Sequence, residues 1–188
     1  MNWKDCQVRL KERLDPQRFE HSLSVSRTAF ELAKTHGCNP ESAKLAGLLH
    51  DYARDMCEKD LLAIAKEHRL ISHPVERQVP LLLHGPVGAL LVQRELKIFD
   101  ADILEAIAVH TTGAPGMSDL AAVVYLADII EPSRDFPGVR MLRSLAQNDS
   151  LDAAVLAALV SGISYCLERN LLIHPISVEA RNYLLGSN

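Results

Sequence analysis

The sequence predicts an all-α fold, built as a single domain over residues 1–188. Apolar residues recur at helical spacing along most of the chain, and Asn, Asp or Ser residues, which favour helix N-termini, precede several of these runs. No segment shows the period-two alternation between hairpin turns that is typical of β-strands. With 188 residues, 48% of them hydrophobic, the chain is long enough to bury one substantial core.

The helices can be placed in order from their periodicity and their end signals. The first carries apolar residues at helical spacing between positions 19 and 33, and Gly37 favours its end. Asn39 and Pro40 predict the cap and first residue of a second helix, which reaches His50. Further helices are expected over residues 59–69, 86–96, 100–110, 118–130, 139–146, 151–169 and 178–185, with a loop at "ISHPVERQVP" and a helix end before Pro132.

Composition excludes several classes of protein. Twenty Lys and Arg residues against 24 Asp and Glu residues are scattered along the chain, so a nucleic-acid partner is not expected. The charged N-terminal stretch lacks the apolar core of a secretory signal, and no run of about 18 apolar residues indicates a membrane span, so a cytoplasmic protein without a membrane partner is expected. The cysteines form no C-x-x-C pair and are expected to be reduced; they are Cys6, Cys38, Cys57 and Cys166.

Ionisable side chains interrupt apolar helical runs at several positions. Examples are the His-Asp pair after "AGLL", the histidines after "PLLL" and "AIAV", and the single carboxylate in "LAAVVYLADII". A buried carboxylate without a partner would cost several kcal/mol, so such a group requires a cation, a metal or a proton. With a histidine beside the apolar stripe of the first helix, the candidate metal ligands are His21, His50, Asp51, His84, His110 and Asp128.

Imidazole nitrogens and carboxylate oxygens without thiolates suit iron, manganese, cobalt, nickel or zinc. Six ligands exceed what one closed site needs and suit two metal ions that share a carboxylate. Neighbouring residues on a helix diverge by about 100°, so His50 and Asp51 can face different sides of a centre, and Asp51 is the expected bridge. A single metal with His84 and His110 as substrate contacts stays open. The other histidines lie in polar or loop segments, and His174 is expected to have a structural role at a helix end.

The order of His21, His50-Asp51 and Asp128 resembles the H…HD…D pattern of the HD-domain superfamily of metal-dependent phosphohydrolases. The segments "LLHGPVGA", "AIAVHTTG" and "YLADIIEPSRDFPGV" are more specifically similar to the YqeK-type symmetrical diadenosine-tetraphosphate hydrolases, over roughly residues 18 to 183. This resemblance implies an all-helical HD domain whose six ligands are those named above. It also implies a di-iron centre and cleavage of diadenosine tetraphosphate into two ADP by a metal-bridging hydroxide.

A polyphosphate substrate calls for arginines at the entrance of the site. Arg54 follows Asp51 by three residues and is the first candidate, in a catalytic as well as a binding role. Arg134 in "EPSRDFPG" and Arg18 near the first ligand are the next candidates, and Thr111 is a candidate phosphate or ribose contact. For each arginine the alternative is an exposed side chain or a surface ion pair.

Three other functions stay open at this point. The same metal centre could hydrolyse deoxynucleoside triphosphates or guanosine tetraphosphate, because pocket shape decides the substrate. HD-type centres can also host oxygen chemistry at a mixed-valence di-iron site. A non-catalytic nucleotide-binding module is disfavoured because degenerate sites lose ligands and all six are present here. The oligomeric state is undecided, with a homodimer as one option.

Overall fold

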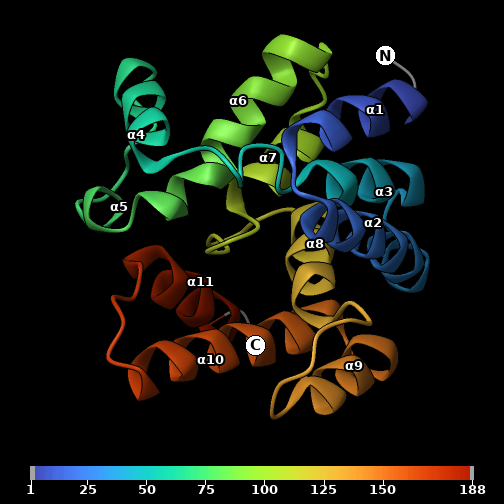
Figure 1. The fold of residues 1–188 in the computed structure, drawn as a ribbon. Helices are drawn as coiled ribbons and strands as arrows, with labels where there is room; N and C mark the ends of the chain where they lie inside the picture. The colour runs from blue at the N-terminus through green and yellow to red at the C-terminus, as the bar shows by residue number, and fades with distance from the viewer. Residues whose placement is uncertain (1–2, 187–188) are drawn as a thin grey trace.

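The computed structural model describes residues 3–186, and these residues contain helices and no strand (Figure 1). The elements are α1 (Trp3–Arg13), α2 (Pro16–His36), α3 (Pro40–Leu49), α4 (Glu58–Glu67), α5 (Val75–Gln78), the 3₁₀ helix η1 (Pro80–Leu83), α6 (His84–Leu96), α7 (Ala101–Val109), α8 (Asp119–Ile130), α9 (Val139–Asn148), α10 (Leu151–Glu168) and α11 (Pro175–Gly186). The predicted all-α fold is confirmed.

Helix α8 lies at the centre of the molecule. Every residue from Leu120 to Ala127 is buried, as expected for a helix that is apolar on all sides. It packs against α2, α3, α7, α9 and α10, and Figure 1 shows it between α2 and α3 on one side and the α10–α11 pair below. Asp128, in the last turn of α8, is therefore held where several helices converge.

The predicted helix ends coincide with capping contacts. The Asn39 side chain accepts hydrogen bonds from the first turn of α3, and Asp100 does the same for α7. Ser118 caps α8. Gly37 ends α2 with φ 78°, a left-handed conformation that a residue with a Cβ rarely adopts.

Three expectations about helices need correction. Helix α1 was not predicted, because its buried stripe is short and its other residues are largely charged; Cys6 and Leu10 are buried. The segment expected to be a loop forms α5 and η1, which are too short for a recognisable period, and they are held by packing of Leu83 against α4 and α6 residues. Helix α11 starts at Pro175 rather than near position 178, because the His174 ring accepts a hydrogen bond from the Ile176 amide. His174 thus has the expected role at a helix end.

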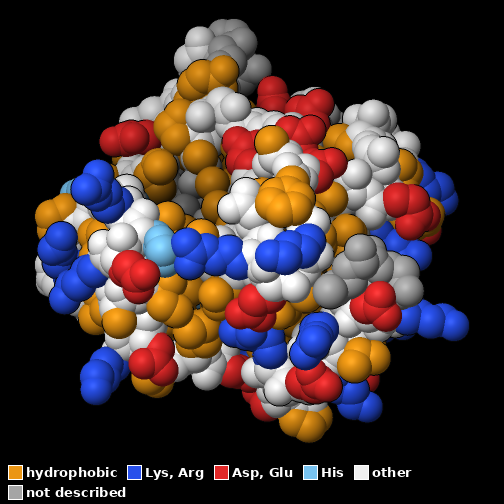
Figure 2. Space-filling model, turned by 90° about the horizontal axis from the view of Figure 1, so that it is seen from above, with side chains coloured by type: hydrophobic (Ala, Val, Ile, Leu, Met, Phe, Trp, Pro, Cys, Tyr) orange, Lys and Arg blue, Asp and Glu red, His pale blue; other side chains and the backbone are white. Residues whose placement is uncertain are grey.

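Helix α10 has the length and composition of a membrane-crossing helix, and 28% of it is buried within the protein. It packs on α8, α9 and α11. Length and composition alone are weak evidence for a membrane span, because core helices of soluble proteins can share them. The expectation of no membrane span stays a prediction. On the face drawn in Figure 2, basic and acidic side chains lie among apolar ones.

Candidate metal centre

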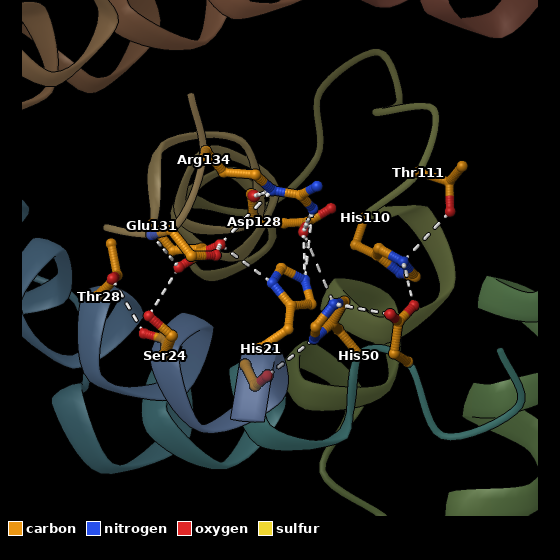
Figure 3. Close-up of polar contacts among 12 residues, drawn as sticks. His21, Ser24, Thr28, His50, His110, Thr111, Asp128, Glu131 and Arg134 are labelled. Carbon is orange, nitrogen blue, oxygen red and sulfur yellow. Dashed lines mark hydrogen bonds and ion pairs between the residues drawn. The ribbon is translucent and has the colours of Figure 1, made fainter. Parts of the chain in front are cut away.

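The six predicted ligands come from five separate parts of the chain and converge in one cluster. Figure 3 shows four of them, His21, His50, His110 and Asp128. They form three overlapping groups, and within each group the ligand atoms lie within 4.8 Å of one another. The groups are His21, His50 and Asp51; His50, His110 and Asp128; and Asp51, His84 and His110. The structure therefore brings together every residue that the sequence singled out as a metal ligand.

Asp51 lies between the two sides of this cluster. Its Oδ1 is 3.1 Å from His84 Nε2 and 3.6 Å from His110 Nε2. Its Oδ2 is 3.5 Å from His50 Nε2. The two oxygens of one carboxylate thus face different histidines, which is the arrangement required of the predicted bridge.

Local helix structure explains why a histidine ends an apolar run at three positions. His50, His84 and His110 directly follow α3, η1 and α7. The last carbonyls of a helix lack backbone partners. Each ring donates its Nδ1 hydrogen to the carbonyl three residues earlier: Gly47 at 2.9 Å, Leu81 at 2.5 Å and Ile107 at 2.7 Å. The Nε2 lone pairs are therefore directed to the cluster.

The nitrogen atoms at the centre have the arrangement that a cation would satisfy. His84 Nε2 and His110 Nε2 are 3.0 Å apart, and with the proton on Nδ1 both are acceptors. His50 Nε2 is buried and has no hydrogen-bond partner among residues 3–186. A buried polar atom without a partner is costly. Neutral imidazoles beside carboxylates are a ligand set that suits iron, manganese, cobalt, nickel or zinc, so the residues present fit a metal centre.

Burial and charge set the protonation of the cluster. Burial lowers the pKa of His50 to about 4, so this ring is neutral at pH 7. Burial also raises the pKa of Asp51, but its contacts with His50, His110 and His84 outweigh burial and hold that pKa well below its ordinary value. The pKa of His21 is raised, because contact with Asp128 outweighs burial. The carboxylates are therefore ionised, and they attract cations.

The cluster opens into a cavity of about 1200 Å³ that is also lined by the predicted substrate-contacting residues Arg18, Arg54, Thr111 and Arg134. Thr111 Oγ1 lies 3.3 Å from His110 Nε2 and 3.5 Å from His84 Nε2. The far wall, formed by α10 and the start of α11, is partly apolar and includes Leu159, Ile163, Tyr165 and Leu172. The cavity lining therefore combines charged and apolar side chains.

The three arginines differ in their partners. Arg18 Nε lies 2.7 Å from Asp55 Oδ1 and 3.4 Å from Asp15 Oδ2. Arg134 donates from Nη2 to Asp128 Oδ1 at 2.5 Å and from Nε to the Asp128 carbonyl at 2.8 Å. The Arg54 side chain makes no hydrogen bond or ion pair with any residue in the range 3–186, although its backbone amide donates to the Asp51 carbonyl. Burial and the nearby Arg18 charge lower its pKa. Arg54 is therefore a half-buried cation without a carboxylate partner among the described residues.

Sequence reasoning missed the residues that support this cluster. The Glu131 side chain is fully buried, and its carboxylate accepts hydrogen bonds from His21, Ser24 and Ser133. Arg143 on α9 donates to the carbonyls of residues 130, 131 and 134 and so holds the segment that carries Arg134. The available signal for Glu131 was a carboxylate directly after the buried α8 and before Pro132.

The HD-domain family profile matches residues 18–133, and the chain belongs to that family. It is 39% identical over 176 residues to the symmetrical bis(5'-nucleosyl)-tetraphosphatase of Halalkalibacterium halodurans, with 94% of this chain and 93% of that protein covered. It is 36% identical to the Bacillus subtilis protein of the same name over the full length of both. A Clostridium acetobutylicum crystal structure, of a predicted HD superfamily hydrolase involved in NAD metabolism, matches with a TM-score of 0.95 and 34% identity, over 100% of this chain and 99% of that one. The two resemblances expected from the sequence are thus confirmed.

Proposed function

We propose that the protein hydrolyses diadenosine tetraphosphate symmetrically into two ADP at a metal centre of two ions, with iron as the expected metal. The observation that carries the proposal is a cluster of four histidines and two aspartates opening into a cavity whose wall holds an unpaired Arg54. The full-length relatives that are symmetrical bis(5'-nucleosyl)-tetraphosphatases support this choice of substrate.

The cavity suits a long anionic substrate. A tetraphosphate bridge carries several negative charges, and Arg54 can bind one phosphate without first breaking an internal ion pair. Arg18 and Arg134 are positioned on the same cavity and would add positive charge along the bridge. Thr111 offers a hydroxyl near the ligand nitrogens. The partly apolar wall can accommodate a nucleoside, because ligand pockets combine apolar surface with a few placed polar groups.

The ligand groups define which residues would hold the metals. His21 and His50 group with Asp51, His84 and His110 also group with Asp51, and Asp128 groups with His50 and His110. Bound transition-metal ions would supply hydroxide near neutral pH and withdraw electron density from the phosphorus under attack. Arg54 orients the phosphate and stabilises the negative charge that develops on it. Symmetrical cleavage adds one water across the central P–O–P linkage, so each product is ADP, and two protons are released when both new terminal phosphates ionise.

Product analysis tests this function. Protein purified without chelator is incubated with diadenosine tetraphosphate, and the nucleotides are separated by chromatography. ADP as the sole product is expected, with activity lost in chelator and restored by metal. ATP with AMP would refute symmetrical cleavage, and faster hydrolysis of a deoxynucleoside triphosphate or of guanosine tetraphosphate would assign a different substrate. Elemental analysis tests the two-metal centre, for which two equivalents per chain are expected and one would refute it.

The remaining properties proposed for this enzyme come from the sequence alone. They are a single domain over residues 1–188, a cytoplasmic location, no nucleic-acid or membrane partner, and a homodimer as the oligomeric option. Size-exclusion chromatography with light scattering tests the last of these.

A further inference from the structure

Glu131 has the most heavily bonded carboxylate at the site. Its side chain is 0% exposed and lies where α8 ends. It accepts hydrogen bonds from Ser24 Oγ at 2.7 Å, from the Ser133 amide at 2.8 Å and from the Ser133 hydroxyl. Its Oε1 lies 3.2 Å from His21 Nδ1 (Figure 3). One buried carboxylate thus joins α2 to the segment that follows α8.

His21 differs from the other three histidines of the cluster in how its Nδ1 is bound. The other three rings follow a helical element and donate to its last carbonyls. His21 lies inside α2, which continues to His36, and carbonyls within a helix are already occupied by backbone amides. Its Nδ1 therefore requires a partner from elsewhere in the fold, and Glu131 is that partner.

Glu131 is ionised and can only accept at this position. The polar groups of Ser24 and Ser133 around its carboxylate all donate to it: the Ser133 amide and the two serine hydroxyls. An ionised carboxylate opposite Nδ1 requires the ring proton on Nδ1. Nε2 lies 2.9 Å from Asp128 Oδ1, so a proton on Nε2 would be shared with that carboxylate, and a bound metal would replace this proton while the Nδ1 proton stays with Glu131. Glu131 is not a member of any of the three ligand groups, so it acts through His21.

We propose that Glu131 is a positioning residue that holds the His21 proton on Nδ1 and thereby makes His21 Nε2 available as a metal ligand. The negative charge of Glu131 also increases the basicity of the ring, as carboxylate partners of metal-bound histidines do. The proposal rests on the metal centre of the proposed function, but not on the proposed substrate.

The test compares Glu131→Gln with the wild-type chain. The amide has nearly the same shape, but its NH2 group would donate toward Nδ1 and favour the ring proton on Nε2, where it blocks metal binding. Isothermal titration of metal-free protein with Zn²⁺ should show an affinity lowered by about 10- to 100-fold. In ¹⁵N-labelled protein with Zn²⁺ bound at pH 8, the long-range ¹H–¹⁵N spectrum should show the His21 proton on Nδ1 in the wild type. The His21 signal is assigned by its loss in His21→Asn.

Glu76→Gln is the matched control. Glu76 is also a buried glutamate; it accepts hydrogen bonds from the Ser72 amide and hydroxyl and the His73 amide, and it lies 3.3 Å from His174 Nε2. It belongs to none of the ligand groups. This variant also loses a charged acceptor from a buried hydrogen-bond cluster, so its melting temperature is expected to fall. Its Zn²⁺ affinity is expected to equal that of the wild type.

Three results would overturn the proposal. The first is Zn²⁺ affinity in Glu131→Gln within twofold of the wild type. The second is a wild-type His21 with its proton on Nε2, a result that decides the matter even if the variant does not fold. The third is a wild-type chain that binds no Zn²⁺, which refutes the metal centre as well. A wild-type chain that binds Zn²⁺ but leaves diadenosine tetraphosphate intact refutes the proposed substrate alone.

Discussion

Replacing Gly85 with alanine should disturb the metal centre by separating two helices. Gly85 is the second residue of α6, and a Cβ built there would lie 2.5 Å from the carbonyl oxygen of Ala108 and 3.2 Å from that of Ile107. Ordinary contact begins at 3.4 Å. Both obstacles are backbone atoms of α7, so no side chain can rotate away. The helices would have to separate by about 1 Å, an overpacking that costs about 1 to 3 kcal/mol.

The expected consequences are a loss of stability and of metal. At about 2 to 4 °C for each kcal/mol in a chain of this size, Gly85→Ala should lower the melting temperature by roughly 2 to 12 °C. Because Gly85 adjoins His84, and the Ile107 carbonyl orients His110, the 3.0 Å approach of the two Nε2 atoms should also be lost. Titration with Zn²⁺ should then show weaker binding than in the wild type.

Gly88→Ala provides the control on the same helix. A Cβ at Gly88 would meet its nearest atoms at 3.6 to 3.7 Å, which is ordinary contact. Alanine is also favoured over glycine within a helix by up to about 1 kcal/mol. This variant should melt at or above the wild-type temperature and bind Zn²⁺ normally. Equal melting temperatures and equal Zn²⁺ affinities for Gly85→Ala and the wild type would refute the packing argument.

Three further predictions concern the site. Arg54→Ala should lower kcat/KM by roughly 10- to 100-fold with bound metal and melting temperature unchanged, because a charge-assisted hydrogen bond contributes about 1.5 to 3 kcal/mol; a lower melting temperature with unchanged kcat/KM would assign Arg54 to the fold. Asp51→Asn should lower metal content and turnover together while circular dichroism shows retained helicity, and near-normal activity would show that the centre is misassigned. Metal-free protein should be most stable near pH 6.5, the ordinary histidine pKa. Below that pH only the unfolded chain protonates His50, whose folded pKa is about 4, so stability should fall by on the order of 3 kcal/mol toward pH 4. The folded chain raises the pKa of His21 and His110, so their protonated rings stabilise the fold. Above pH 6.5 that stabilisation is lost as these rings deprotonate. Thermal melts in chelator across this range check both slopes, and a flat profile would contradict them.

Local signals account for much of what could be predicted. A histidine that follows an apolar helical run lies at a helix end with unpaired carbonyls, so His50, His84 and His110 were recognisable from one sequence segment each. The caps at Asn39 and Asp100 act within one turn and were equally accessible. Helix α1 escaped prediction because its buried stripe is short.

Only the tertiary structure decided how these parts act together. The sequence made both Arg18 and Arg54 candidate phosphate contacts, with Arg54 first. The packing of α2 beside the turn after α3 pairs Arg18 with Asp55 and leaves the Arg54 side chain without a carboxylate partner among residues 3–186. The contact of Glu131 with His21 joins residues 110 positions apart. Sequence periodicity determined the helices and the ligand types of this protein, because those follow from neighbouring residues. The partner of each polar group depends on how distant helices pack, and no local pattern carries that information.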